Sequence, residues 1–403
     1  MKKVLAILLA LAMVFAFCAC GSSDNQSSDE GTEATAVKVG MVCIGDENQA
    51  YDRNFYKAAD AATEILAAER INVEWMYKYN NPTDVAEDNA ELAEAGCVVI
   101  FNNSYGQEDQ MLTVAPDYPD TIFAGLTNQQ GALDSLDNTV NAFPNIFEAR
   151  YLAGVAAGCK LQEMIDNGEI AEDEAVIGYV GAFAFSEVKS GYTSFYLGAR
   201  SVCPSATMMV EYINSWGDTQ LEAAAAQDLV DRGAVLISQH SDNTSPATTA
   251  QQNGKFHIGY NISMSDVAPE ASIISSRIDW TKYFVYLIEC AVNGETPDQD
   301  YMGHGLATEE VCLTELNEAI AAEGTADAIE AARSAIASGE LQVFDTSTFT
   351  VGGKEAAECL IFDTDGDFVP DDTNGIFDGY FHESYFISAP AFSLVIDGIT
   401  ELN

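Results

Sequence analysis

From Val37 onward, short apolar runs alternate with longer runs of helical spacing, and this alternation restricts the possible folds most strongly. The apolar run Val37–Val42 predicts a strand, and apolar residues at helical spacing between Tyr51 and Arg70 predict a helix. Cys97–Phe101 is continuously apolar, which is typical of a strand covered on both faces. Regular alternation of this kind predicts parallel sheets with helices on both faces.

The alternation occurs twice, which predicts two α/β domains. A first set ends near Phe143, and a long predicted helix from Asn145 to Met164 opens a second set that ends at Ile278. Two Ala-rich runs at 314–322 and 326–337 then predict helices. The expected division is an N-terminal lobe at 37–144 completed by about 280–340, a C-terminal lobe at 145–275, and a segment of short strands and turns at 340–403 without a lobe assignment.

The first 36 residues predict export and anchoring. Two lysines follow Met1, an apolar run extends from Val4 to Phe17, and Cys20 comes directly after a small residue. This order is typical of a signal peptide at 1–19, and the cysteine resembles the lipobox of bacterial lipoproteins, in which the thiol is lipidated. Residues 20–36 then form a polar, flexible tether. We expect a lipid-anchored protein on the outer face of the cell membrane; an ordinary cleaved signal is the alternative.

The charge of the chain excludes one broad class of function. Its 63 acidic and 17 basic side chains give a formal net charge of -46. Without a basic patch, nucleic-acid binding is not expected. The cysteines beyond Cys20 are seven, an odd number, and no pair has metal-ligand spacing, so we interpret them as small buried hydrophobic residues.

No cofactor and no metal are expected. The acidic run at Asp363–Asp372 could hold calcium, but its glycine is fourth rather than sixth, as an EF-hand would need, so a solvated acidic turn is favoured.

Aromatic, carboxylate and amide side chains follow the predicted strands of both domains. Because ligands of parallel sheets bind at the carboxyl ends of strands, these residues predict a cleft between the two domains. Aromatic faces stack on a flat ring, and carboxylates accept its N–H groups or sugar hydroxyls. Polar loops that only cap helices are the alternative for any one of them. The candidates from these strand ends are Asp46, Tyr51, Asp52, Tyr105, Asp109, Phe183, Phe185, Trp216, His240, Asp242 and Asn261.

Five segments together resemble one family. Asn145–Gly158 (NIFEARYLAGVAAG) is similar to the "EASYLAGVLAG" helix of the basic membrane protein (BMP) family, and Ser215–Asp218 to its "SWTD" turn. Similar matches occur at 188–200, at 228–242 and at Phe256–Asn261, so the resemblance covers about Val37 to Ala291. Members are substrate-binding lipoproteins of ABC transporters, many specific for purine nucleosides.

The resemblance implies a fold, a ligand and partners. The fold is the type I periplasmic-binding-protein fold, with two Rossmann-like lobes, a hinge and a ligand cleft between them. The implied ligand is a purine nucleoside or base, the implied partners are ABC permease subunits, and a monomer without enzymatic activity is expected.

The residues that match the family's pocket are Asp46 with Tyr51–Asp52, Asp109, and Phe183 with Phe185. Two positions differ from the family. Ser263 stands where many members have an aspartate for ribose hydroxyls, and Asp279–Trp280 stands where a lysine is frequent. Trp280 is therefore a further candidate contact, and a free base or another ring compound stays open as the ligand.

Two other functions remain open. A ligand-sensing surface lipoprotein would share every feature above and differ only in its partner. A surface-exposed nucleoside hydrolase is suggested by His240 beside Asp242, but no nucleophile elbow or His-rich metal cluster accompanies them.

Overall fold

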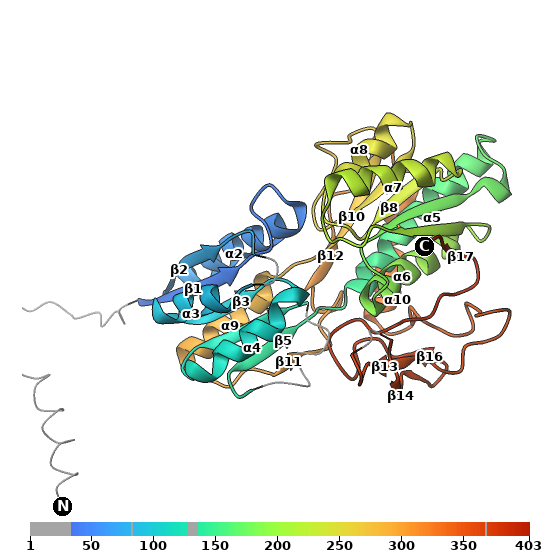
Figure 1. Cartoon of the computed structure of the whole chain (residues 1–403). Helices are drawn as coiled ribbons and strands as arrows, with labels where there is room; N and C mark the ends of the chain where they lie inside the picture. Colours follow the sequence, from blue (N-terminus) through green and yellow to red (C-terminus); the bar gives the residue numbers. More distant parts are fainter. Residues whose placement is uncertain (1–33, 82–83, 128–135, 367–368) are drawn as a thin grey trace, which may run out of the picture. The chain divides into compact units, whose positions relative to one another are not determined.

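The computed structural model describes residues 34–403 except 82–83, 128–135 and 367–368. The predicted signal peptide at 1–19, the lipidation site Cys20 and nearly all of the tether lie outside the described residues. Thr35–Asn403 forms one compact unit. Two separate large sheets organise this unit (Figure 1).

The first sheet has six strands, and all of its pairings are parallel. Its helices α2 and α9 pack in the core on one face, whereas α3 and α4 cover the other. Its strand order is β11 (Asp300–Tyr301), β5 (Thr139–Ala142), β4 (Ile122–Leu126), β3 (Cys97–Asn102), β1 (Thr35–Val42) and β2 (Ile71–Lys78). Its helices are α2 (Ala50–Ala68), α3 (Ala86–Glu94), α4 (Glu108–Val114) and α9 (Thr281–Asn293), with 3-10 turns at Tyr105–Gln107 and Ala115–Asp117.

The second sheet has seven strands, parallel except for the pairing of β12 with β10. Helices α5 and α6 cover one face, and α7 and α8 cover the other. Its order is β12 (Val311–Leu313), β10 (Ser272–Ile278), β9 (Phe256–Tyr260), β8 (Leu236–Gln239), β6 (Val176–Gly181), β7 (Thr207–Tyr212) and β17 (Ile399–Glu401). Its helices are α5 (Ile146–Asp166), α6 (Ser186–Val202), α7 (Thr219–Asp231), α8 (Ser245–Gln252) and α10 (Thr325–Ala337), with a 3-10 turn at Glu172–Glu174.

Helices α5 and α6 pack backbone against backbone because each presents glycine to the backbone of the other. A Cβ atom placed on Gly154 would lie 1.9 Å from the carbonyl oxygen of Phe195, and one on Gly198 would lie 2.0 Å from that of Tyr151. No real side chain tolerates such distances, so only glycine permits this approach. The contact fixes the position of α6 against α5.

The described chain passes between the two sheets three times. It leaves β5 for α5, returns from β10 to α9, and leaves β11 for β12. The segment expected to complete the N-terminal lobe at about 280–340 is thus divided: α9 and β11 join the first sheet, whereas β12 joins the second and α10 packs on α5.

The helix predicted at 314–322 was wrong. This stretch contains turns, and its backbone is held to the start of β10 instead. Asn317 donates its backbone N–H to Ile273 and its side-chain amide to Pro269 and Ser272. The long-range bonds outweigh the high helix propensity of its alanines.

The C-terminal segment contacts both sheets. It carries two short hairpins, β13 (Leu360–Phe362) with β14 (Asp372–Asn374) and β15 (Ile376–Phe377) with β16 (Tyr380–Phe381), drawn in red in Figure 1. The backbone N–H of Ser388 donates to Asp300 on β11 at 2.7 Å, and β17 extends the second sheet beside β7.

Candidate functional site

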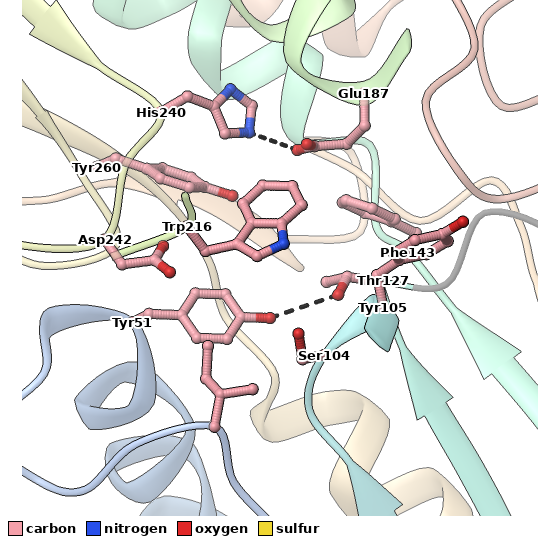
Figure 2. Close-up of a pocket in the computed structure, with 11 residues that line it drawn as sticks. Tyr51, Ser104, Tyr105, Thr127, Phe143, Glu187, Trp216, His240, Asp242 and Tyr260 are labelled. Atoms are coloured by element: carbon pink, nitrogen blue, oxygen red, sulfur yellow. Dashed lines mark hydrogen bonds and ion pairs between the residues drawn. The ribbon is translucent and has the colours of Figure 1, made fainter. Parts of the chain in front are cut away.

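A pocket lies where the carboxyl ends of the strands of both sheets converge. About 470 Å³ of space within it, including the part open to solvent, is not filled by protein atoms. The residues that line it come from loops after β1, β3, β4, β5, β7 and β8, from the starts of α2 and α6, and from the end of β9 (Figure 2). They are Ile44, Tyr51, Ser104, Tyr105, Thr127, Phe143, Glu187, Trp216, His240, Asp242 and Tyr260.

Aromatic rings form much of the wall. Phe183 and Phe185 stack on each other with centroids 5.1 Å apart, and the edge of Phe183 packs on Trp216 at 5.3 Å. The ring centroid of Phe185 also lies 6.0 Å from that of Tyr105, which follows β3 of the first sheet. The two phenylalanines therefore support Trp216 and Tyr105, which line the pocket themselves.

Tyr51 is held by the loop after β3. Its hydroxyl donates to the backbone carbonyl of Asn103 and lies 3.4 Å from the hydroxyl of Thr127. The side-chain amide of Asn103 in turn donates to Asp52 at 2.8 Å. Asp52 is completely buried, and this burial raises its pKa to about 6. Asp52 thus lies behind the pocket wall and orients the loop that positions Tyr51.

A buried polar network forms the other side of the pocket. The imidazole Nε2 of His240 lies 2.6 Å from Glu187 Oε1, and its Nδ1 lies 3.3 Å from the hydroxyl of Tyr179. Arg150 donates to that same hydroxyl at 2.9 Å and stacks on the ring of Tyr260 at 3.7 Å. Burial lowers the pKa of His240 even though Glu187 opposes the shift. The imidazole is therefore held mainly neutral.

Asp242 faces the pocket from the loop after β8. Its backbone N–H donates to the carbonyl of Trp216 at 2.9 Å, which ties the two loops together. Burial raises the pKa of its carboxyl well above the usual range, and the nearby carboxyls of Glu222 and Asp52 add to this effect. A hydrogen-bond donor or a cation beside this carboxyl would favour its ionised form.

The structure brings together five of the predicted residues as lining groups: Tyr51, Tyr105, Trp216, His240 and Asp242. Asp52, Phe183 and Phe185 lie directly behind them. The other four predicted residues are elsewhere.

Asp46 lies in the turn after β1, where it accepts from the backbone N–H of Asn48, and Asp109 is exposed on α4. Asn261 lines a separate hollow next to Arg277. Trp280 is only 1% exposed and stacks on Phe55 at 5.2 Å, so its ring belongs to the core. A ligand contact at these four residues stays a prediction.

Sequence reasoning missed six lining residues: Ile44, Ser104, Thr127, Phe143, Glu187 and Tyr260. Ile44, Ser104, Thr127 and Phe143 directly follow strand ends, so a stricter reading of each loop would have found them. Tyr260 ends β9 itself, and Glu187 lies in the first turn of a helix. The backbone of Thr127 has a left-handed φ of 69°, an unusual conformation that only the three-dimensional structure reveals.

Neither a metal-binding cluster nor a membrane-spanning helix occurs among the described residues. In that part of the chain, no group of three or more His, Cys, Asp or Glu side chains is arranged to hold a metal ion. None of its helices combines the length and apolarity needed to cross a bilayer. Within the acidic run at 363–372, Asp371 accepts from the hydroxyl and backbone N–H of Thr364.

Solved structures establish the fold class. An ABC transporter solute-binding protein from Conexibacter woesei aligns with a TM-score of 0.55 and 20% identity, over 76% of this chain and 98% of that one. A solute-binding protein of an ABC transporter system from Aeropyrum pernix aligns with a TM-score of 0.59 and 17% identity, over 76% and 93%. The expected type I periplasmic-binding-protein fold is therefore confirmed.

Sequence comparisons identify the family. A protein from Haloferax volcanii, named for glucose binding in an ABC transporter, is 30% identical over 81% of this chain and 78% of its own length. A purine-binding protein from Brucella abortus is 29% identical over 66% of this chain and 71% of its own. The family model for PnrA-like ABC transporter substrate-binding proteins matches residues 36–346. The chain belongs to this family, Bmp.

Proposed function

We propose that this protein captures a purine nucleoside or a related base in the pocket between its two sheets and delivers it to an ABC importer. The observation that carries the proposal is the pocket itself, which combines aromatic and hydroxyl groups from both sheets with carboxylates from the second sheet. Aromatic faces stack on a flat ring, and buried polar groups select for hydrogen-bonding partners.

Family membership supports the transport part of this proposal. The protein is an ABC transporter substrate-binding protein of the PnrA-like family, which implies a small-molecule ligand and permease subunits as partners. Its homologues are solute-binding proteins, and these are not enzymes. A hydrolase would differ in one observable: the binding protein returns its ligand unchanged, whereas a hydrolase would split it.

The relatives favour two ligand classes. The Brucella relative is named for purine binding, which supports a purine ligand here. The Haloferax relative is named for glucose, so a hexose is the second candidate. The rings that line the pocket favour the first, because Tyr51, Tyr105 and Trp216 offer faces on which a base can stack, although sugars also stack on aromatic rings.

The test is a thermal-shift panel of purine nucleosides, free bases and hexoses. A ligand at about 100 times its Kd stabilises the folded state by about 2.7 kcal/mol, which raises Tm visibly. Shifts with purine compounds alone support the proposal, and shifts with hexoses alone would replace it by the second candidate.

Trp216→Ala tests the site separately. Loss of a stacking face costs about 1–3 kcal/mol, so the Kd should rise about 5- to 150-fold. Leu221→Ala is the control, since Leu221 is 46% exposed on the neighbouring helix α7. Equal affinity in both variants would remove the site assignment.

We further propose that the protein is anchored outside the membrane by lipid on Cys20. Support comes from the apolar run and small residue before this cysteine and from the extracytoplasmic role of the family. Cys20→Ala should abolish incorporation of labelled fatty acid and release the protein from the membrane fraction. Retention of both label and membrane association would contradict the anchor.

A further inference from the structure

Two carboxylates in the pocket have oxygen atoms that accept no hydrogen bond from any described residue. Asp242 is 4% exposed, lines the pocket, and receives no side-chain hydrogen bond from the described part of the chain. Glu187 is 6% exposed; its Oε1 contacts His240, but its buried Oε2 has no partner there. Figure 2 shows both side chains at the space beside Trp216. Buried carboxylates in this condition are costly, so a ligand group is their natural partner.

Carboxyl groups outnumber cationic groups around this space. Among the described residues, no lysine or arginine lines the pocket, and the neutral imidazole of His240 adds no charge. Arg150 lies beneath the pocket, 1% exposed, and is the nearby cation that acts on Asp242. Asp52 and Glu222, both fully buried, act on Asp242 in the opposite sense. One guanidinium therefore faces four carboxyl groups.

The aromatic wall suits a cation as well. The face of an aromatic ring is electron-rich and attracts a positive charge within about 6 Å. One face of the Tyr260 ring already contacts a cation, because the guanidinium of Arg150 lies 3.7 Å from the ring centroid. Tyr51, Tyr105 and Trp216 also line the space. An anionic ligand would meet repulsion from the carboxylates and from these ring faces together.

We propose that the pocket selects ligands in which a flat nitrogen heterocycle carries a positive charge, with Asp242 and Glu187 as its counter-charges. The inference rests on the proposed function for the location and ring shape of the ligand, and adds the charge that the site requires. The chemical class is a protonated or N-alkylated heterocycle. A neutral ring with the same outline would leave both carboxylates uncompensated.

The experiment compares isomers that differ in charge. At neutral pH 1-methyladenosine is a cation whose positive charge is delocalised over its ring, whereas its isomer N6-methyladenosine is neutral. Isothermal titration calorimetry with the full-length protein should give at least about tenfold tighter binding of the cation. Asp242→Asn should bring the two affinities within about threefold of each other. Asp60→Asn, an exposed carboxylate on α2, is the matched control and should keep the full preference.

A second pair separates this proposal from the purine assignment. The cation 1-methylnicotinamide and neutral nicotinamide share a flat ring without a purine. If only the nicotinamide pair binds and its cation is preferred, the purine assignment fails and the charge preference stands. Equal or tighter binding of the neutral members, binding of neither cation, or an unchanged preference in Asp242→Asn would each overturn the proposal.

The stability of Asp242→Asn without ligand gives an independent readout. Because no described donor bonds the Asp242 carboxylate and three carboxyl groups oppose its charge, the amide should unfold at the same or a higher Tm than the parent protein. A lower Tm would mean that the carboxylate already has a stabilising partner, which would remove the basis of the inference.

Discussion

His257 should make the protein less stable as the pH falls from 7 to 5. The residue is completely buried on β9, and its Nε2 lies 3.0 Å from the side-chain oxygen of Gln239. Burial lowers its pKa to about 3, whereas histidine in an unfolded chain has a pKa of about 6.5. Between these values the unfolded state binds more protons, so stability is present above pH ~6.5 and is lost as the pH falls toward 3.

The magnitude follows from the two pKa values. Each pH unit well inside the window costs about 1.4 kcal/mol, and integration from pH 7 to pH 5 gives a loss of about 2 kcal/mol from this one side chain. Other titrating groups also change stability over this range. The contribution of His257 is therefore isolated only as a difference between two proteins.

The assay is urea unfolding of the parent protein and of His257→Gln at pH 7 and pH 5. Glutamine can donate an amide N–H to Gln239 but does not titrate. Whatever the substitution costs at pH 7, the parent should lose about 2 kcal/mol more than the variant on going to pH 5. Equal losses in the two proteins would refute the reasoning, because His257 would then be free to take up a proton in the folded state.

Three further predictions concern packing, the C-terminal strand and the thiols. Gly154→Ala should lower the unfolding free energy by about 2 kcal/mol in urea, because overlap with Phe195 outweighs the gain of about 1 kcal/mol in helix propensity; a more stable variant would contradict the close contact. Deleting residues 399–403 removes β17 and the carboxylate that accepts from Tyr212, and should lower Tm in calorimetry by about 5 °C; an unchanged Tm would show that β17 adds nothing to the sheet. The seven described cysteines are free, five buried and two half-buried, so a thiol reagent should modify at most those two before unfolding; rapid modification of more would contradict their burial.

The strands and helices of both sheets followed from local pattern. Cys97–Phe101 is apolar without interruption and lies in the buried strand β3, and the long helix predicted at 145–164 is observed at Ile146–Asp166. Such patterns depend on neighbours a few residues apart, which the sequence contains directly. The run at 314–322 shows where this fails, because backbone bonds to β10 decide its conformation.

The membership of the pocket depended on packing across the chain. Trp216 and Trp280 both follow predicted strands, and nothing local distinguishes them; in the structure the first lines the pocket and the second stacks on Phe55 in the core. Glu187 enters the pocket because α6 lies against α5 through glycine, a contact between residues 40 positions apart or more.

By itself the sequence determined the two α/β halves, the aromatic and polar side chains at the strand ends and the acidic character of the chain, because these are properties of short segments and of composition. Tertiary structure alone decided which strand-end side chains meet, which are buried behind them, and how the segment after residue 340 joins both sheets. The physical reason is that each of these depends on contacts between residues far apart in sequence, where shape and charge must fit together and no local signal specifies the partner.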